Sequence, residues 1–203
     1  MSPHHPTSHN PEPRTTMPPN PLGLALRNKR VGHASLVWAR PDLQAPETFA
    51  LTSPAFSHKG PIPKQYRGRL FGHNTSPALR WTPPPQATVE LVLIVEDADS
   101  PFGRPNTHGL AAGIDPALGG IPTDGLTDSR ASGAAKLGKA GPRRGWFGAM
   151  PIRSHGPHSY VFQIFALDRR LDLPPKFTLT QTLHAMSGRV IARAKLEGTA
   201  EKD

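Results

Sequence analysis

The sequence has no cysteine, few aromatic residues and no long apolar run. The absence of cysteine excludes disulfide scaffolds, thiolate metal sites and cysteine nucleophiles. No run approaches the ~18 apolar residues that a membrane-spanning helix needs. The N-terminus also lacks the apolar stretch of a signal peptide, so a cytoplasmic protein is expected.

Proline, glycine and positive charge are abundant instead. The 203 residues include 25 prolines and 19 glycines, which favours short strands joined by turns over a helical bundle. Lysine and arginine outnumber aspartate and glutamate by 24 to 15, which gives a formal charge of +9. Six of the basic residues and no acidic one lie in Arg130–Arg153, a stretch that could follow phosphate groups. With aromatics at 6% and no recognition motif, nucleic acid is not expected as a partner.

Residues 1–47 are predicted to be a disordered Pro/His-rich tail followed by a lead-in. Seven prolines and three histidines between Met1 and Pro21 leave little to bury, so this stretch cannot offset the entropy lost on ordering. The lead-in Leu22–Pro46 shows no sustained period and is expected to be extended and dispensable for folding. Whether it packs on the domain or on a partner stays open. The domain is predicted at 48–199, with a short tail at 200–203.

Two stretches predict strands that are buried on both faces. Val89–Val95 and Tyr160–Leu167 are nearly all apolar and rich in β-branched or aromatic residues. The other predicted elements are strands near Phe49–Phe56, Ala78–Trp81 and Val190–Leu196 and a helix over Thr178–Met186. Together they predict an all-β fold with a minor helix, arranged as a β-sandwich.

Polar side chains follow the end of the first buried strand. Asp97 and Asp99 lie two residues apart, so on an extended chain both carboxylates can face one cavity. His108 and His158 begin further strands. A turn would also explain the two aspartates. Two carboxylates and two histidines at strand ends nevertheless predict a common site.

Five segments carry a resemblance to a known family. They are Gly72–Trp81 (G-H-N-T-S-P-A-L-R-W), Asp97–Pro101 (D-A-D-S-P), His108, Gly148–Tyr160 and Ser187–Thr199. In this order they resemble the phosphatidylethanolamine-binding proteins, in the bacterial form called Raf kinase inhibitor-like. The resemblance implies a Greek-key sandwich of two antiparallel sheets and a small pocket for a phosphate-bearing or other anionic head group. A phospholipid head group as ligand, a kinase or protease as regulated partner, and a homodimer are further expectations from it.

The same resemblance implies which residues bind the ligand. They are Asp97, Asp99, His108, Gly148, Pro151, His158 and Tyr160. The sequence departs from the family pattern at four positions: Ala98, Gly109, Ala149 and Ser159 stand where the family has proline, an aromatic residue, proline and arginine. These departures bear on the ligand more than on the fold.

A pocket with two carboxylates has to avoid repelling an anion. A histidine can be protonated against the aspartates and donate to phosphate oxygens. A carboxylate can take a proton and donate. An aspartate can instead face the ammonium of ethanolamine while histidine and tyrosine hold its phosphate. The residues alone do not rank these alternatives.

A metal-assisted hydrolase that uses the Asp/His cluster is the alternative function, because both residue types bind zinc or manganese. The sequence has no His-Glu-x-x-His, no Gly-rich phosphate loop and no Gly-x-Ser-x-Gly. We therefore predict a binding protein with no catalytic residue, no cofactor and no metal ion.

Overall fold

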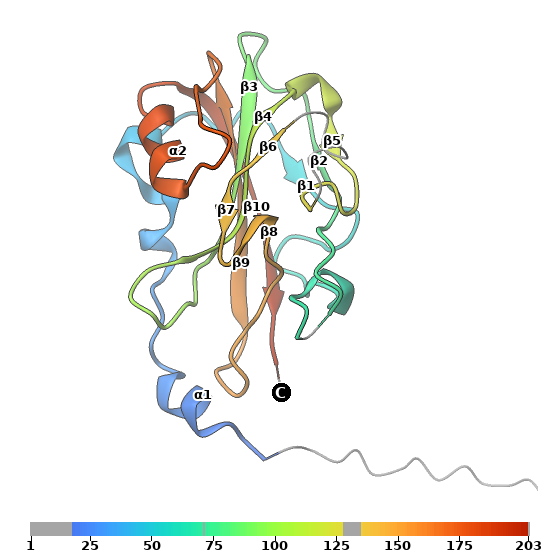
Figure 1. Cartoon of the computed structure of the whole chain (residues 1–203), viewed down its shortest axis with the longest axis vertical. Helices are drawn as coiled ribbons and strands as arrows, with labels where there is room; N and C mark the ends of the chain where they lie inside the picture. Colours follow the sequence, from blue (N-terminus) through green and yellow to red (C-terminus); the bar gives the residue numbers. More distant parts are fainter. Residues whose placement is uncertain (1–17, 71, 128–134, 203) are drawn as a thin grey trace, which may run out of the picture.

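The fold is seen in a computed structural model that describes residues 18–70, 72–127 and 135–202 (Figure 1). The predicted disorder of the tail up to residue 17 lies outside these ranges. The described ranges contain ten strands: β1 (Leu51–Thr52), β2 (Leu79–Trp81), β3 (Glu90–Asp97), β4 (Asn106–Ile114), β5 (Gly120–Ile121), β6 (Lys136–Leu137), β7 (Lys139–Ala140), β8 (Arg143–Trp146), β9 (His158–Leu167) and β10 (Val190–Ala200). The α-helices are α1 (Pro21–Leu26) and α2 (Leu179–Met186), and 3-10 turns lie at His33–Ser35, Val37–Ala39, Pro41–Leu43, Lys64–Tyr66 and Pro116–Leu118.

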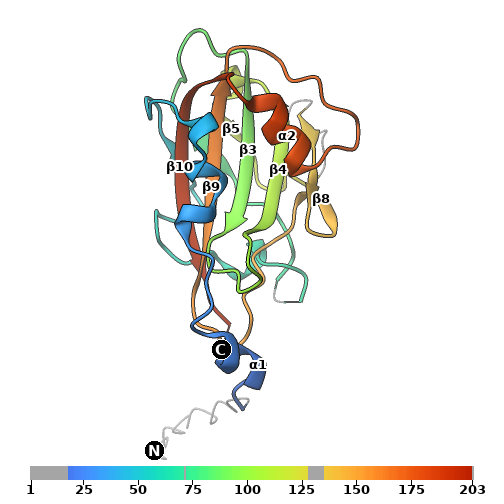
Figure 2. The ribbon, with the colours of Figure 1, turned by 90° about the vertical axis from the view of Figure 1, so that its left-hand side faces the viewer.

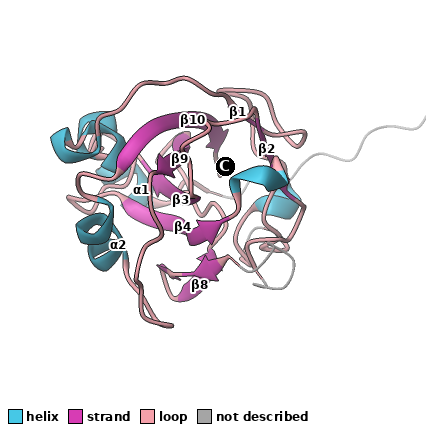
Figure 3. Ribbon diagram, turned by 90° about the horizontal axis from the view of Figure 1, so that it is seen from above, coloured by secondary structure: helices cyan, strands magenta, loops and turns pink. Residues whose placement is uncertain are grey.

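The described strands form two antiparallel sheets. The large sheet has seven strands in the order β10-β9-β3-β4-β8-β7, with β6 also paired to β4, and the small sheet has the order β1-β2-β5. In the view from above, β1 and β2 lie on one side of the large sheet and α2 lies on the other (Figure 3). The predicted mostly β, antiparallel architecture with a minor helical part is therefore confirmed.

The central strand β3 is buried along its whole length. Leu91, Leu93 and Val95 belong to the core between the two sheets. Val92 and Ile94 belong to a second core on the opposite face. An apolar residue is needed at each of these positions because both faces of the strand are covered.

The second core contains the segment that precedes β1. Val37 and Leu43 are buried there, and the ring of Trp38 lies 6.0 Å from that of Phe165. The guanidinium of Arg193 lies 4.0 Å from the centre of the Trp38 ring, within cation–π range. The turns of this segment and α2 lie together in front of the large sheet (Figure 2). The lead-in is therefore not extended, contrary to expectation, but folds into short turns that pack on the large sheet, and its dispensability for folding stays a prediction.

Two buried polar side chains of the sheet hold this segment in place. The carboxylate of Glu96 accepts hydrogen bonds from the Val37 N–H and from the Gln163 side-chain amide, each at 2.8 Å. The Gln163 side-chain oxygen accepts from the Trp38 N–H at 2.6 Å. Burial raises the pKa of Glu96, although the hydrogen bonds from Gln163 and Val37 act in the opposite direction.

The outer edge of β10 is covered by irregular backbone. The Glu197 carbonyl accepts from the Lys59 N–H at 2.7 Å, and the Thr199 carbonyl accepts from the Ile62 N–H at 2.7 Å. The Thr199 N–H donates in turn to the Gly60 carbonyl at 2.8 Å. This edge is therefore already hydrogen-bonded within the chain along 197–199.

Candidate functional site

Three strand ends meet at one end of the large sheet. Asp97, the last residue of β3, lies opposite Tyr160 on β9 and Asn106 on β4. Because β3 runs antiparallel to both neighbours, its end adjoins their beginnings, which carry His158 and His108. The fold thus gathers the predicted acidic, histidine and tyrosine side chains from strands that are far apart in the sequence.

A continuous hydrogen-bond chain runs through this end of the sheet. The Asp97 Oδ2 lies 2.8 Å from Nδ1 of His158. The opposite nitrogen, Nε2 of His158, lies 2.7 Å from Nδ1 of His155. The Nε2 of His155 lies 2.8 Å from the carbonyl oxygen of Leu26. Asp97, His155 and His158 are all buried, so solvent does not compete for these contacts.

The chain of hydrogen bonds determines how many protons it contains. The Leu26 carbonyl only accepts, so Nε2 of His155 donates to it. Two more protons are needed, one between the two rings and one between His158 and Asp97. Two neutral imidazoles supply two protons, so the third makes one ring an imidazolium or resides on Asp97. In both cases the three side chains together carry no net charge.

His108 and Tyr160 complete the cluster of rings. The two rings meet edge to face with their centres 4.9 Å apart, and Tyr160 is stacked near His158 at 6.4 Å. His108 also stacks on Phe147 at 5.3 Å, and its Nδ1 lies 2.7 Å from the Phe147 carbonyl. Burial lowers the pKa of His108 against the opposing effect of the Asp97 charge, and burial raises the pKa of Tyr160. Both groups are therefore neutral around pH 7.

The second carboxylate, Asp99, is bound on both oxygens. Its Oδ2 accepts from the Ser159 N–H at 2.7 Å, and its Oδ1 forms an ion pair with Arg30 at 2.7 Å. Burial acts to raise the pKa of Asp99, but the hydrogen bonds from Arg30 and Ser159 outweigh it, so the pKa is lowered. Ser159 stands where the resembled motif has arginine, and the guanidinium beside Asp99 comes from the lead-in instead.

The two remaining predicted residues lie on the segment between β8 and β9. Gly148 donates its N–H to the Asn74 side-chain oxygen at 2.9 Å. A Cβ at Gly148 would lie 2.6 Å from the Arg67 carbonyl carbon, so a side chain does not fit there. Pro151 is buried on the same segment. Both positions shape the site through backbone packing rather than through a charged group.

The lead-in covers this end of the sheet, where α1 lies in Figures 1 and 2. Arg30 donates to the carbonyls of Pro157 at 2.7 Å and His155 at 3.0 Å, in addition to Asp99. The backbone of α1 touches the neighbouring loop so closely that a Cβ at Gly23 would overlap the Arg153 carbonyl oxygen.

Sequence reasoning missed Arg30 and His155 as members of the site. The only signal for His155 was its position three residues before His158. Arg30 has no signal in the sequence, because its contacts depend on the way the lead-in folds back.

The residues described in the structure include no group of three or more histidine, aspartate or glutamate side chains that could hold a metal ion. Asp97 and His158 bind each other, and Asp99 binds Arg30. The alternative of a metal-assisted hydrolase therefore gains no support from this arrangement. Within the same part of the chain, no helix is long and apolar enough to cross a membrane.

The fold and the site define an antiparallel β-sandwich with a buried Asp/His/Tyr cluster at one end of its large sheet. Residues 52–201 match the family model described as phosphatidylethanolamine-binding protein. The chain belongs to the phosphatidylethanolamine-binding protein family, as the sequence motifs predicted.

Relatives occur in bacteria and archaea. The "Putative lipoprotein LppC" of Mycobacterium tuberculosis is 34% identical over 171 residues, which cover 84% of this chain and 81% of that protein. A UPF0098 protein of Methanothermobacter thermautotrophicus is 35% identical over 153 residues, covering 73% and 95% of the two chains. Among solved structures, CT736 from Chlamydia trachomatis has a TM-score of 0.67 at 33% identity and covers 76% of this chain and 98% of its own. YbcL from E. coli has a TM-score of 0.71 at 23% identity, covers 76% and 99%, and supports the fold alone.

Proposed function

We propose that this protein is a non-catalytic binding protein for phosphate-type anionic head groups, and that Nε2 of His158 is the main anion contact. The observation that carries the proposal is the pair of partners on His158. The buried carboxylate of Asp97 orients one nitrogen, and the other nitrogen meets His155 at 2.7 Å. The His155 Nδ1 thus lies where a phosphate oxygen would accept a hydrogen bond from His158.

The charges of the cluster support an anion rather than a cation. All four carboxylate oxygens are bound: those of Asp97 by His158 and the Asp99 N–H, and those of Asp99 by Arg30 and the Ser159 N–H. Each of these oxygens already accepts from a donor of the protein, which weakens the attraction of the two carboxylates for an ammonium group. The proton in the His–His–Asp chain and the guanidinium of Arg30 offset the two negative charges. This supports a protonated histidine or a protonated carboxylate as the way in which the site avoids repelling an anion.

Tyr160 is the second proposed anion donor. Its hydroxyl oxygen accepts the Met150 N–H at 3.1 Å, and no acceptor among the described residues takes its proton. Since burial raises the pKa of Tyr160, the hydroxyl keeps that proton and can donate it. Hydrogen bonds to a charged group contribute roughly 1.5–3 kcal/mol each, so two or three such contacts give weak to moderate affinity.

Titration calorimetry with phosphorylethanolamine, and with ethanolamine as the phosphate-free control ligand, tests the proposal. We expect His155→Ala to bind phosphorylethanolamine more tightly than the wild type, because the resident acceptor on His158 is removed. His158→Gln keeps a donor toward Asp97 and should bind at least tenfold more weakly. Leu24→Ala on the exposed side of α1 is the control variant. Equal binding by wild type and His158→Gln, or no binding by wild type and His155→Ala, would exclude the anion site.

Regulation of a kinase or protease, binding of whole phospholipids, dimer formation and a cytoplasmic location stay predictions. A competition experiment links the first of these to the site: phosphorylethanolamine should displace a protein partner that uses this end of the sheet. The location is open to test by cell fractionation, which is of interest because one relative is named as a lipoprotein.

A further inference from the structure

A basic cleft lies beside β8, separate from the Asp/His cluster. It is an open cleft of about 610 Å³, formed by the β7–β8 hairpin, the loop before α2 and two neighbouring loops. Its lining residues are Asn74, Thr127, Lys139, Pro142, Arg143, Arg144, Trp146, Lys176, Phe177 and Thr178. The hairpin belongs to the basic stretch Arg130–Arg153, whose cations have no part in the proposed anion site at His158.

Four cationic side chains line this cleft. Lys139, Arg143 and Arg144 come from the hairpin, and Lys176 comes from the loop before α2. None of the ten lining residues is acidic, and no ion pair between described residues uses any of the four. Like charges gathered around one cleft repel one another, and a bound anion relieves that repulsion.

Two hydrogen bonds, one from a backbone N–H and one from a side chain, join the hairpin to the loop before α2. The Lys139 N–H donates to the Phe177 carbonyl at 2.9 Å, and the Arg144 guanidinium donates to the Pro175 carbonyl at 2.8 Å. A Cβ at Gly138 would overlap the Phe177 ring, so glycine is required for this close approach. The backbone that carries the four cations is therefore held in place before a ligand binds, which lowers the entropy lost on binding.

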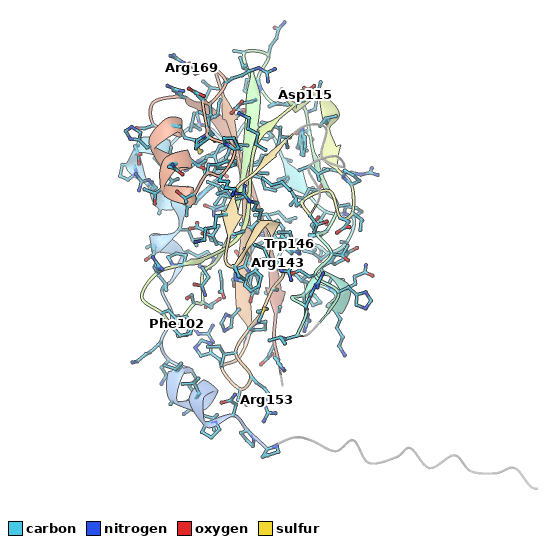
Figure 4. All side chains as sticks on the ribbon, viewed as in Figure 1. Phe102, Asp115, Arg143, Trp146, Arg153 and Arg169 are labelled. Atoms are coloured by element: carbon cyan, nitrogen blue, oxygen red, sulfur yellow. The ribbon has the colours of Figure 1, made fainter. Side chains whose placement is uncertain are left out.

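One residue that lines the cleft has an unpartnered polar group. Trp146 is 1% exposed and stacks on Phe162 with ring centres 5.7 Å apart. Its indole Nε1 has no hydrogen-bond partner, which is costly for a buried N–H. Trp146 and Arg143 stand at the two ends of β8 and are labelled in Figure 4. The indole N–H itself has no accessible surface, so the four cations are the groups that would bind an acceptor-rich anion in this cleft.

We propose that this cleft is a second ligand site, which binds a small oligophosphate, either free or as the phosphate chain of a nucleoside triphosphate. Its volume falls in the range of small-molecule sites, roughly 300–1,000 Å³. Arginine guanidinium groups and lysine ammonium groups are the usual partners of phosphate oxygens. Single-stranded nucleic acid is a poorer match, because Trp146 and Phe177 are buried and offer no face on which a base could stack.

Calorimetric titration of the full chain with tripolyphosphate, inorganic phosphate and ATP tests the proposal. Wild type should bind tripolyphosphate at least tenfold more tightly than inorganic phosphate, with an affinity that falls as salt is raised. Arg143→Ala/Lys176→Ala should weaken tripolyphosphate binding at least tenfold. Arg80→Ala/Arg169→Ala removes the same charge from other exposed positions and should leave binding within about twofold. ATP binding tighter than that of tripolyphosphate would identify a nucleotide as the source of the phosphate chain.

A second measurement separates a site from general charge attraction. The protein has three tryptophans, so its indole N–H signals can be followed by NMR, with Trp146→Phe identifying that of Trp146. Tripolyphosphate should shift the Trp146 signal, and His158→Gln should not change this response. Equal weakening by both double variants, no shift at Trp146, or tighter binding of an oligonucleotide than of tripolyphosphate would overturn the proposal. Because His158→Gln belongs to the other site, failure of one proposal is distinguishable from failure of the other.

Discussion

The Nδ1 of His155 and the Nε2 of His158 lie 2.7 Å apart, within hydrogen-bond distance. Because the outer nitrogen of His155 donates to a backbone carbonyl, this pair connects the lead-in with the aspartate at the end of β3. The contact between the two histidine rings and the position of the lead-in are therefore linked.

The first prediction concerns Asp97. Asp97→Asn keeps an acceptor for the Asp99 N–H and offers an amide N–H to His158, so both imidazoles can be neutral with every contact made. Asp97→Ala leaves the buried ring without its partner and should destabilise the protein by about 1–3 kcal/mol more than Asp97→Asn. Chemical denaturation measures the difference. Equal stability of the two variants would show that the hydrogen-bond chain is not formed.

The second prediction tests the packing of the lead-in. Leu43→Ala removes a fully buried side chain from the second core and should cost about 2–5 kcal/mol. Leu24→Ala, at a position 44% exposed on α1, should change stability by less than about 0.5 kcal/mol. Thermal melting of both variants provides the comparison. A Leu43→Ala protein with the same melting temperature as the wild type would support a lead-in that is dispensable for folding.

The third prediction concerns Gly23. An added methyl group at this position overlaps the Arg153 carbonyl oxygen, so Gly23→Ala should lift α1 from the loop and weaken the contact between His155 and Leu26. We expect tighter binding of phosphorylethanolamine, severalfold or more, with little loss in melting temperature. Leu24→Ala is the matched control on the same helix. Unchanged affinity would mean that α1 does not control access to His158.

The fourth prediction concerns pH and Glu96. Since burial raises the pKa of Glu96, the folded protein holds this proton more tightly than the unfolded chain does. The resulting stability is fully present below the unfolded pKa and is lost as the pH rises through the folded pKa. Glu96→Gln should therefore be more stable than wild type near pH 7 and lose that advantage in acid, by about 1.4 kcal/mol for each unit of pKa difference. Chemical denaturation of both proteins at pH 4 and pH 7 measures this difference in stability. The same difference at both pH values would contradict a raised pKa of Glu96.

The sequence predicted the parts of the fold that depend on local composition. The strands near Val89–Val95 and Tyr160–Leu167 are present because their apolar residues meet a core on each face. The strand expected over Phe49–Phe56 is only Leu51–Thr52, because Pro54 has no N–H to extend the pairing. The family and the antiparallel sandwich are confirmed.

The parts that escaped prediction depend on contacts between distant segments. Arg30 meets Asp99 and His155 across 69 and 125 positions of the chain, and Glu96 meets Val37 across 59. No local pattern encodes such pairs. The seven expected ligand residues lie at the same end of the sheet or on the segment beside it, but their role in binding stays a prediction.

The covered edge of β10 bears on how two copies of this chain could associate. An edge strand with free backbone groups is a template on which another molecule can add a strand, and this leads to sheet-to-sheet dimers or to fibrils. Along 197–199 those groups already bind the chain's own backbone at Lys59–Ile62. Two copies therefore cannot merge their large sheets along that stretch, so a homodimer would have to use another edge or another surface. The same backbone cover keeps the 197–199 stretch of β10 from acting as a template for aggregation.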